Sequence, residues 1–147
     1  MSEKEEKLQK LYLEFQILDQ QIKQLEKQSL MLNNQLIELM ITNQSLDDIK
    51  QVKEGTEILT PLSSGIYAKA ELKDSKNFIV TVGSNVALAK DADSTKKLIE
   101  AQIDEIKKLQ ESLVSQMQNQ TAKAAVLEDE INNLISALQE NKEIKNK

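Results

Sequence analysis

The placement of glycine and proline constrains this chain more than any other feature of its sequence. Such residues are the strongest interruptions of regular structure. They fall in one short stretch, at Gly55, Pro61, Gly65 and Gly83. The sequence therefore predicts two long uninterrupted segments, residues 1–54 and 94–147, joined by a broken module at 55–93.

The module has the pattern of four short β-strands in two hairpins. Apolar and polar residues alternate from Ile66 to Leu72, and the stretch 78–82 is β-branched and aromatic, as strands usually are. Loops at 63–65 and 83–85 suit hairpins, because glycine and asparagine tolerate positive φ. The expected strands are about 57–62, 66–72, 77–82 and 86–90.

Hairpins of this size bury little core and are marginal alone. Their unpaired edges invite pairing with other chains. We therefore expect the module to be an assembly element rather than a polar loop between helices. Its expected contact residues are the apolar strand positions Ile66, Ala68, Ala70, Leu72, Phe78, Val80, Val82, Val86 and Leu88.

The first long segment carries a coiled-coil seam. Ser2 and Glu5 have the spacing of a capping box at a helix start, and Gly55 is expected to end the helix. Apolar residues then recur at alternating spacings of three and four, the signature of a heptad repeat. The seam is Leu8, Leu11, Phe15, Leu18, Ile22, Leu25, Ser29, Leu32, Leu36, Leu39, Asn43 and Leu46.

The second segment carries a matching seam. Asp91, Asp93 and Ser94 supply a helix cap and first-turn acids. Two successive spacings of four, between residues 109 and 117, predict a stutter that relaxes the supercoil. The expected seam is Ile99, Gln102, Ile106, Leu109, Leu113, Met117, Gln120, Ala124, Leu127, Ile131, Leu134 and Leu138.

The two seams share one antiparallel register. Leu46 would face Ile99 beside the module, and the residue numbers of each facing pair add to 145 or 146 in all twelve layers. Two separate parallel dimers would leave this match unexplained. Asn43 opposite Gln102 would form a polar layer, a common device for fixing register.

Composition excludes several classes of function. The 147 residues contain no cysteine and no histidine, which removes thiolate chemistry and the commonest general base. A net charge of −5 without arginine makes a poor nucleic-acid binder. No phosphate loop, metal-binding pattern or catalytic pair stands out, so we expect no enzyme, cofactor or metal. With no apolar run long enough for a bilayer and no signal peptide, we expect a cytoplasmic protein without a membrane partner.

The module resembles a known family. Residues 58–72, ILTPLSSGIYAKAEL, are similar to the first hairpin of the archaeal alpha-type prefoldin subunits, and residues 80–86, VTVGSNV, to their Val-x-Val-Gly-x-Gly turn. Two hairpins rather than one point to the alpha type. The resemblance implies a mainly α fold: a long antiparallel two-helix coiled coil with two central β-hairpins, as one domain over 1–147.

The resemblance also implies a function. Prefoldins are ATP-independent chaperones in which two alpha subunits assemble with four beta-type subunits through their hairpins. Their coiled-coil tips hold unfolded client proteins and pass them to a group II chaperonin. The alternative for this chain is a static coiled-coil scaffold or tether without client binding.

Some apolar residues lie off the seam and are candidates for client contact. The expected client-binding residues, near the free ends of the helices, are Tyr12, Leu13, Ile17, Ile135 and the terminal seam residue Leu138. A second off-seam cluster, nearer the module, is Leu30, Met31, Ile37, Met40 and Ile41. The alternative is that such residues are tolerated surface apolars, which most proteins carry.

Overall fold

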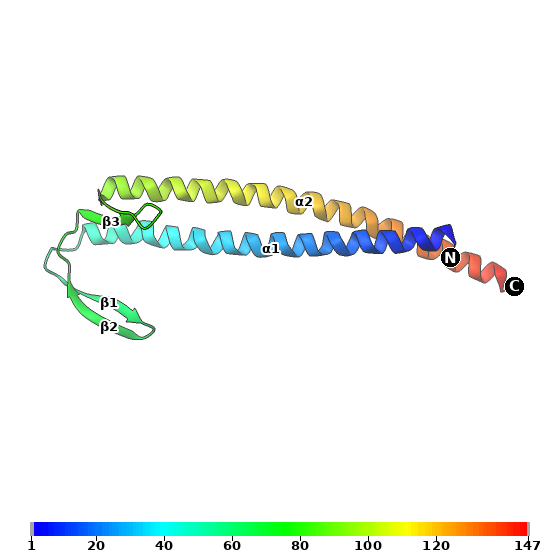
Figure 1. Ribbon diagram of the computed structural model, residues 1–147, viewed down its shortest axis with the longest axis horizontal. Coiled ribbons are helices and arrows are strands. Elements are labelled where there is room, and N and C mark those ends of the chain that lie inside the picture. Colours follow the sequence, from blue (N-terminus) through cyan, green and yellow to red (C-terminus); the bar gives the residue numbers. More distant parts are fainter. Residues whose placement is uncertain (1, 147) are drawn as a thin grey trace. The chain divides into compact units, whose positions relative to one another are not determined.

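The computed structural model describes residues 2–146 and contains two long helices with two β-hairpins between them (Figure 1). This confirms the expected fold class. In chain order the elements are α1 (Glu3–Lys50), β1 (Glu57–Ser63), β2 (Ile66–Glu71), β3 (Asn77–Thr81), β4 (Ala87–Asp91) and α2 (Ala92–Lys145).

The chain divides into two compact units. The terminal unit comprises Met1–Asn33 and Lys108–Lys147, and so holds the first part of α1 and the last part of α2. The hairpin unit comprises Asn34–Lys107, and so holds the remaining helical segments and all four strands. Each unit is described by itself below.

The ends of α1 follow local hydrogen bonding. The Glu5 backbone N–H donates to the Ser2 side-chain oxygen at 3.3 Å, which is the expected cap. The helix ends at Lys50, earlier than the sequence suggested, because the next bonds tighten to the i→i+3 type. Gly55, with φ of 87°, donates its N–H to the Leu72 carbonyl at 2.7 Å. It therefore opens the first hairpin rather than closing the helix.

Asp91 begins α2. Its carboxylate accepts the Ser94 backbone N–H at 2.7 Å, and its carbonyl accepts the Thr95 hydroxyl at 2.7 Å. The bond from the Ser94 backbone lowers the pKa of Asp91, and the Ser94 side chain adds to the effect, because both bonds favour the charged carboxylate. The expected cap at Asp91 is thus confirmed, and α2 starts at Ala92, two residues before the predicted position 94.

The seam of α1 is confirmed at every position. Each of the twelve predicted residues is buried or half-buried, and Leu11 and Leu46 are the most covered of them. The off-seam residues between them are mostly exposed, which is the pattern of a helix with one covered stripe.

The seam of α2 corrects two predicted layers. Leu109 is 54% exposed whereas Gln110 is half-buried, and Gln102 is exposed whereas Ile103 is half-buried. The predicted stutter is therefore wrong, and an unbroken heptad frame runs along the helix. The apolar residues on both sides keep that frame, so one leucine stays in solvent instead of shifting the phase of the helix.

Ion pairs join the two helices within the hairpin unit. The Lys96 ammonium donates to both carboxylate oxygens of Asp47, at 2.7 and 2.6 Å, and the Lys50 ammonium lies 3.5 Å from Asp93. The Lys96 hydrogen bond is the main cause of a lowered pKa at Asp47 and, reciprocally, of a raised pKa at Lys96. These side chains remain accessible to water, so the pairs fix the antiparallel register more than they stabilise the fold.

Grooves on the helix pair support the same register. Each groove is lined by residues of both helices and contains one predicted pair of facing seam residues. These pairs are Leu39 with Ile106 in the hairpin unit, and Leu25 with Gln120 and Leu18 with Leu127 in the terminal unit.

Among the described residues no side chain is fully buried. Even the most covered apolar ones, Ile99 and Ile131, keep a few per cent of their surface in water. A pair of helices covers each seam residue from one side only, which leaves its flanks wet. The core is therefore a row of small layers, without a central region in which side chains are fully buried.

Asn43 offers a test of the seam. Its side-chain oxygen is buried and accepts no hydrogen bond from any residue between 2 and 146. Replacing Asn43 by leucine should raise stability by about 1–3 kcal/mol, the cost of an unsatisfied buried polar group. Thermal unfolding followed by circular dichroism measures this. Asn34→Leu, at an exposed position of α1, is the control. A lower melting temperature for Asn43→Leu than for wild type would contradict the assignment.

Strands β1 and β2 pair antiparallel from Glu57↔Glu71 to Pro61↔Tyr67. The register shifts between Pro61 and Ser63, and proline is tolerated here because β1 is an edge strand with a bulge. The tight turn needs Gly65, whose φ is 80°. In the view of Figure 1 this hairpin stands clear of the helical segments of its unit.

Strands β3 and β4 form the second hairpin, from Asn77↔Asp91 to Thr81↔Ala87. The Val82 N–H donates to the Val86 carbonyl at 2.9 Å and extends the ladder toward the turn. The turn then holds three successive residues with positive φ, namely Gly83, Ser84 and Asn85. The sequence located this turn, and Asn85 accepts the left-handed conformation there as expected.

Asp74 organises the link between the hairpins. Its carboxylate accepts the backbone N–H groups of Lys76 and Asn77 at 2.8 and 3.1 Å. The Lys76 bond is the main cause of the lowered pKa of Asp74, followed by the bond from the Asn77 side chain. The Lys76 carbonyl in turn accepts the Ala92 N–H at 3.0 Å, so the link is tied to the start of α2.

Candidate functional site

The hairpins present unpaired strand edges. They form two separate two-stranded sheets, so within the described chain each of the four strands has one neighbour only. A strand edge with free N–H and carbonyl groups is a template for pairing with another chain. This arrangement makes the module a candidate assembly surface.

The predicted assembly residues divide into two groups. Ile66, Val82, Val86 and Leu88 are exposed, whereas Ala68, Ala70, Leu72, Phe78 and Val80 are half-buried. Phe78 and Val80 share one face of β3, so the chain itself partly covers that face. The contact of all nine with another subunit stays a prediction.

Sequence reasoning missed several exposed apolar residues of the module. They are Ile58, Leu59, Leu62, Tyr67 and Ile79. The prediction assumed one apolar face for each strand and therefore took alternate positions. The signal was present in β1, where adjacent apolar residues at 58 and 59 place apolar groups on both faces of the hairpin.

The terminal unit presents the predicted client-contact residues. Tyr12, Leu13 and Ile17 are exposed on α1, whereas Ile135 and Leu138 are half-buried on α2. With Leu8 as heptad position a, Tyr12 lies at e, Leu13 at f and Ile17 at c. Tyr12 therefore borders the seam, whereas Leu13 and Ile17 lie on the outer face of α1. The three exposed residues form a band around α1 rather than one flat patch.

No metal centre is found among the residues that the structure describes. Between residues 2 and 146 there is no cluster of three or more acidic side chains placed to hold a metal ion. Over the same residues no helix has the length and apolar character needed to span a membrane. What the structure does offer is two long helices with matching seams, free strand edges and exposed apolar side chains, which together define a coiled-coil assembly protein.

Comparison with known proteins names the family. The family model for "Prefoldin subunit" matches residues 18–142, and the chain therefore belongs to the prefoldin family. The expected resemblance to alpha-type subunits is confirmed by curated relatives. "Prefoldin subunit alpha" of Pyrococcus horikoshii is 31% identical over 118 residues, covering 77% of this chain and 80% of the relative. "Prefoldin subunit alpha" of Thermofilum pendens is 25% identical over 123 residues, covering 84% and 95%.

A solved structure shares the fold. A chain from the cryo-EM structure of filamentous PFD from Methanocaldococcus jannaschii aligns with a TM-score of 0.71 and 22% sequence identity. The alignment covers 79% of this chain and 96% of that chain. The likeness supports the helix–hairpin–helix architecture described above.

Proposed function

We propose that this chain is a subunit of an ATP-independent chaperone that holds unfolded proteins. The main support for this proposal is a set of exposed apolar residues on the terminal unit that do not belong to the seam. They are Tyr12, Leu13 and Ile17. Contact with an unfolded chain would remove them from water, worth about 25 cal/mol per Å² before ordering costs. Several such arms in one complex would add avidity to weak single contacts.

The hairpins supply the assembly that avidity requires. Four free strand edges and apolar groups on both faces of β1–β2 favour a complex in which neighbouring subunits complete the sheets. Membership of the prefoldin family supports a complex of two alpha subunits with four beta-type subunits. It also supports the transfer of bound clients from this complex to a group II chaperonin. The same membership supports a cytosolic location and a role that is not enzymatic.

A direct assay separates this function from that of a static tether. The chain is purified together with a beta-type prefoldin subunit, and aggregation of a chemically unfolded client is followed by light scattering without nucleotide. We expect aggregation to be suppressed at near-equimolar complex, because binding of the unfolded state needs no ATP. Scattering equal to that of the client alone, at several ratios of complex to client, would favour the tether.

A further inference from the structure

We propose that one side of the terminal unit binds an extended segment of unfolded polypeptide, with a large apolar side chain in a groove and the main chain along adjacent glutamines. This inference rests on the proposed function and gives it a second contact surface besides the exposed band at Tyr12, Leu13 and Ile17. The groove is open and has a volume of about 440 Å³. Its lining residues are Glu14, Leu18, Ala122, Lys123, Val126 and Leu127.

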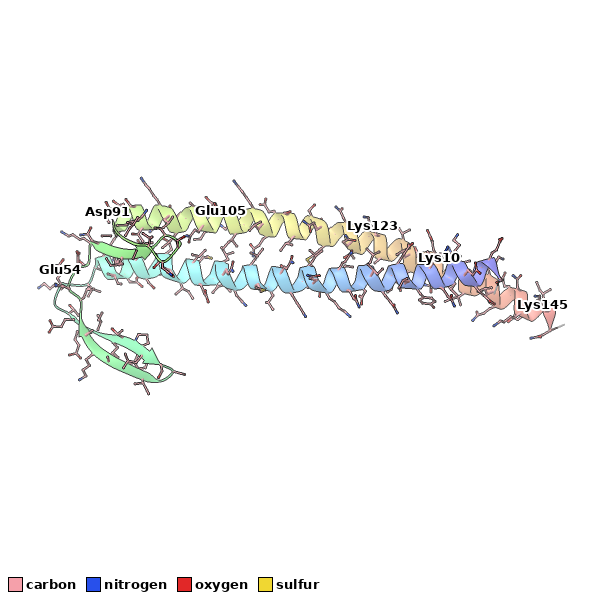
Figure 2. All side chains as sticks on the ribbon, in the orientation of Figure 1. Lys10, Glu54, Asp91, Glu105, Lys123 and Lys145 are labelled. Carbon is pink, nitrogen blue, oxygen red and sulfur yellow. The ribbon has the colours of Figure 1, made fainter. Side chains whose placement is uncertain are left out.

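The groove has an apolar floor and a rim of mixed charge. Leu18 and Leu127 are facing seam residues, and Val126 stands beside them, 57% exposed. Glu14 and Lys123 occupy g positions on the two helices and place one carboxylate and one ammonium at the rim (Figure 2 labels Lys123). Because the rim charges cancel, the groove disfavours neither acidic nor basic segments. That suits unfolded proteins of varied sequence.

A second groove continues from the first along both helices. Its lining is almost entirely glutamine: Gln21, Gln24, Leu25, Gln28, Gln116 and Gln120. Both grooves are lined at g positions of both helices, which places them on the same side of the seam. A glutamine amide has donors and an acceptor, like a peptide group, and can bond a main chain whatever its side chains are.

Gln120, which lines the second groove, has an unsatisfied acceptor, as Asn43 does in the hairpin unit. Its side-chain oxygen is buried and accepts no hydrogen bond from the residues that the structure describes. A buried acceptor without a donor costs free energy that a bound N–H would recover. A main-chain N–H of a segment lying in the glutamine groove would be such a donor once the Gln120 amide turns toward the groove.

The short length of the apolar floor indicates which kind of polypeptide can bind in the groove. A second coiled coil, such as another copy of this chain, would need an apolar stripe sustained over several heptads. Here the apolar lining on α2 extends over less than two helical turns, from Ala122 to Leu127, before the glutamines begin. One large side chain of an extended segment fits this length, and a packed helix does not.

Two fluorescein-labelled peptides test the proposal with the full chain. Both have the same polar, extended sequence and differ only at the central residue, which is phenylalanine or serine. Fluorescence anisotropy should show at least fivefold tighter binding of the phenylalanine peptide. Val126→Lys should abolish this preference, whereas Val114→Lys should preserve it, because Val114 is 48% exposed on the same helix but lines neither groove.

Replacing the glutamines should change peptide binding in a different way from replacing Val126. The double variant Gln24→Ala, Gln116→Ala should weaken both peptides by a similar factor of about three or more, since main-chain bonds do not depend on the central residue. Circular dichroism melts check that every variant remains folded. Equal binding of the two peptides to wild type, or an unchanged preference in Val126→Lys, would contradict the proposal that this groove binds the peptide. So would an equal loss in Val114→Lys, or unchanged binding in the glutamine variant.

These outcomes are separable from failure of the proposed function. If the complex suppresses client aggregation but the peptide preference is absent, the groove is wrong and the chaperone function stands. If the complex does not suppress aggregation at all, the proposed function fails irrespective of the peptide results.

Discussion

Replacing Ile79 by lysine is expected to abolish assembly of the chain while leaving its fold intact. Ile79 is 75% exposed, and its face of β3 is opposite the face of Phe78 and Val80, which the chain itself partly covers. An added charge there is solvated in the isolated chain and disturbs none of its packing. In an assembled complex the same charge would be buried without a partner, at a cost of several kcal/mol.

The measurement is the native mass of the chain, alone and after co-expression with a beta-type prefoldin subunit. Ile144→Lys is a matched control, since Ile144 is 73% exposed but lies near the end of α2 and belongs to the terminal unit, which holds none of the strands. We expect the control to assemble as wild type and the Ile79 variant to remain a helical monomer. A native-mass complex formed by Ile79→Lys would show that this face is not an interface. Val80 is a poorer probe, because its half-burial would mix assembly with folding.

Replacing Leu13 and Ile17 by serine is expected to remove most client holding without affecting assembly. Each side chain contributes up to about 1.5 kcal/mol when its exposed half becomes covered, so a single arm would bind roughly tenfold to a hundredfold more weakly. Neither residue belongs to the seam, so the helix pair should melt as in wild type. Light scattering of an unfolded client reports the loss, and native mass reports intact assembly.

The control for this variant lies on the same helix. Ile37 and Ile41 have the same spacing of four and closely similar exposure, 47% and 61% against 48% and 59% for Ile17 and Leu13. They belong to the hairpin unit, whereas the client-contact residues belong to the terminal unit. If Ile37→Ser, Ile41→Ser loses as much client holding as the first pair, general surface hydrophobicity would explain the binding. If neither pair matters, the proposed band is wrong.

The sequence was sufficient for the fold because its strongest signals are periodic. The α1 seam is a long repeat in which every layer agrees with its neighbours, so the heptad frame is overdetermined. The strands were found because proline and glycine bound them and β-branched residues fill them. Local chemistry also located the helix cap at Asp91 and the turn at Asn85.

The predictions were wrong where the apolar or polar character of a residue disagreed with its position in the heptad or strand pattern. Leu109 looked like a seam residue because it is apolar, yet a continuous heptad frame buries Gln110 in its place. Ile79 was overlooked because alternation suggested that one face of each strand is polar. The groove at Val126 was invisible to sequence reasoning, because it forms only when residues about one hundred positions apart lie in one antiparallel register.

Because the core is a row of small layers, the helix pair can become longer without being repacked. A globular core must be redesigned when residues are inserted, because its packing closes in three dimensions. Here each layer of the helix pair depends only on its neighbours. Seven residues added to both helices at the same height would preserve every layer and lengthen the pair by about 10 Å. The reach of the arms can therefore vary in steps while the hairpins, and whatever they assemble with, stay the same.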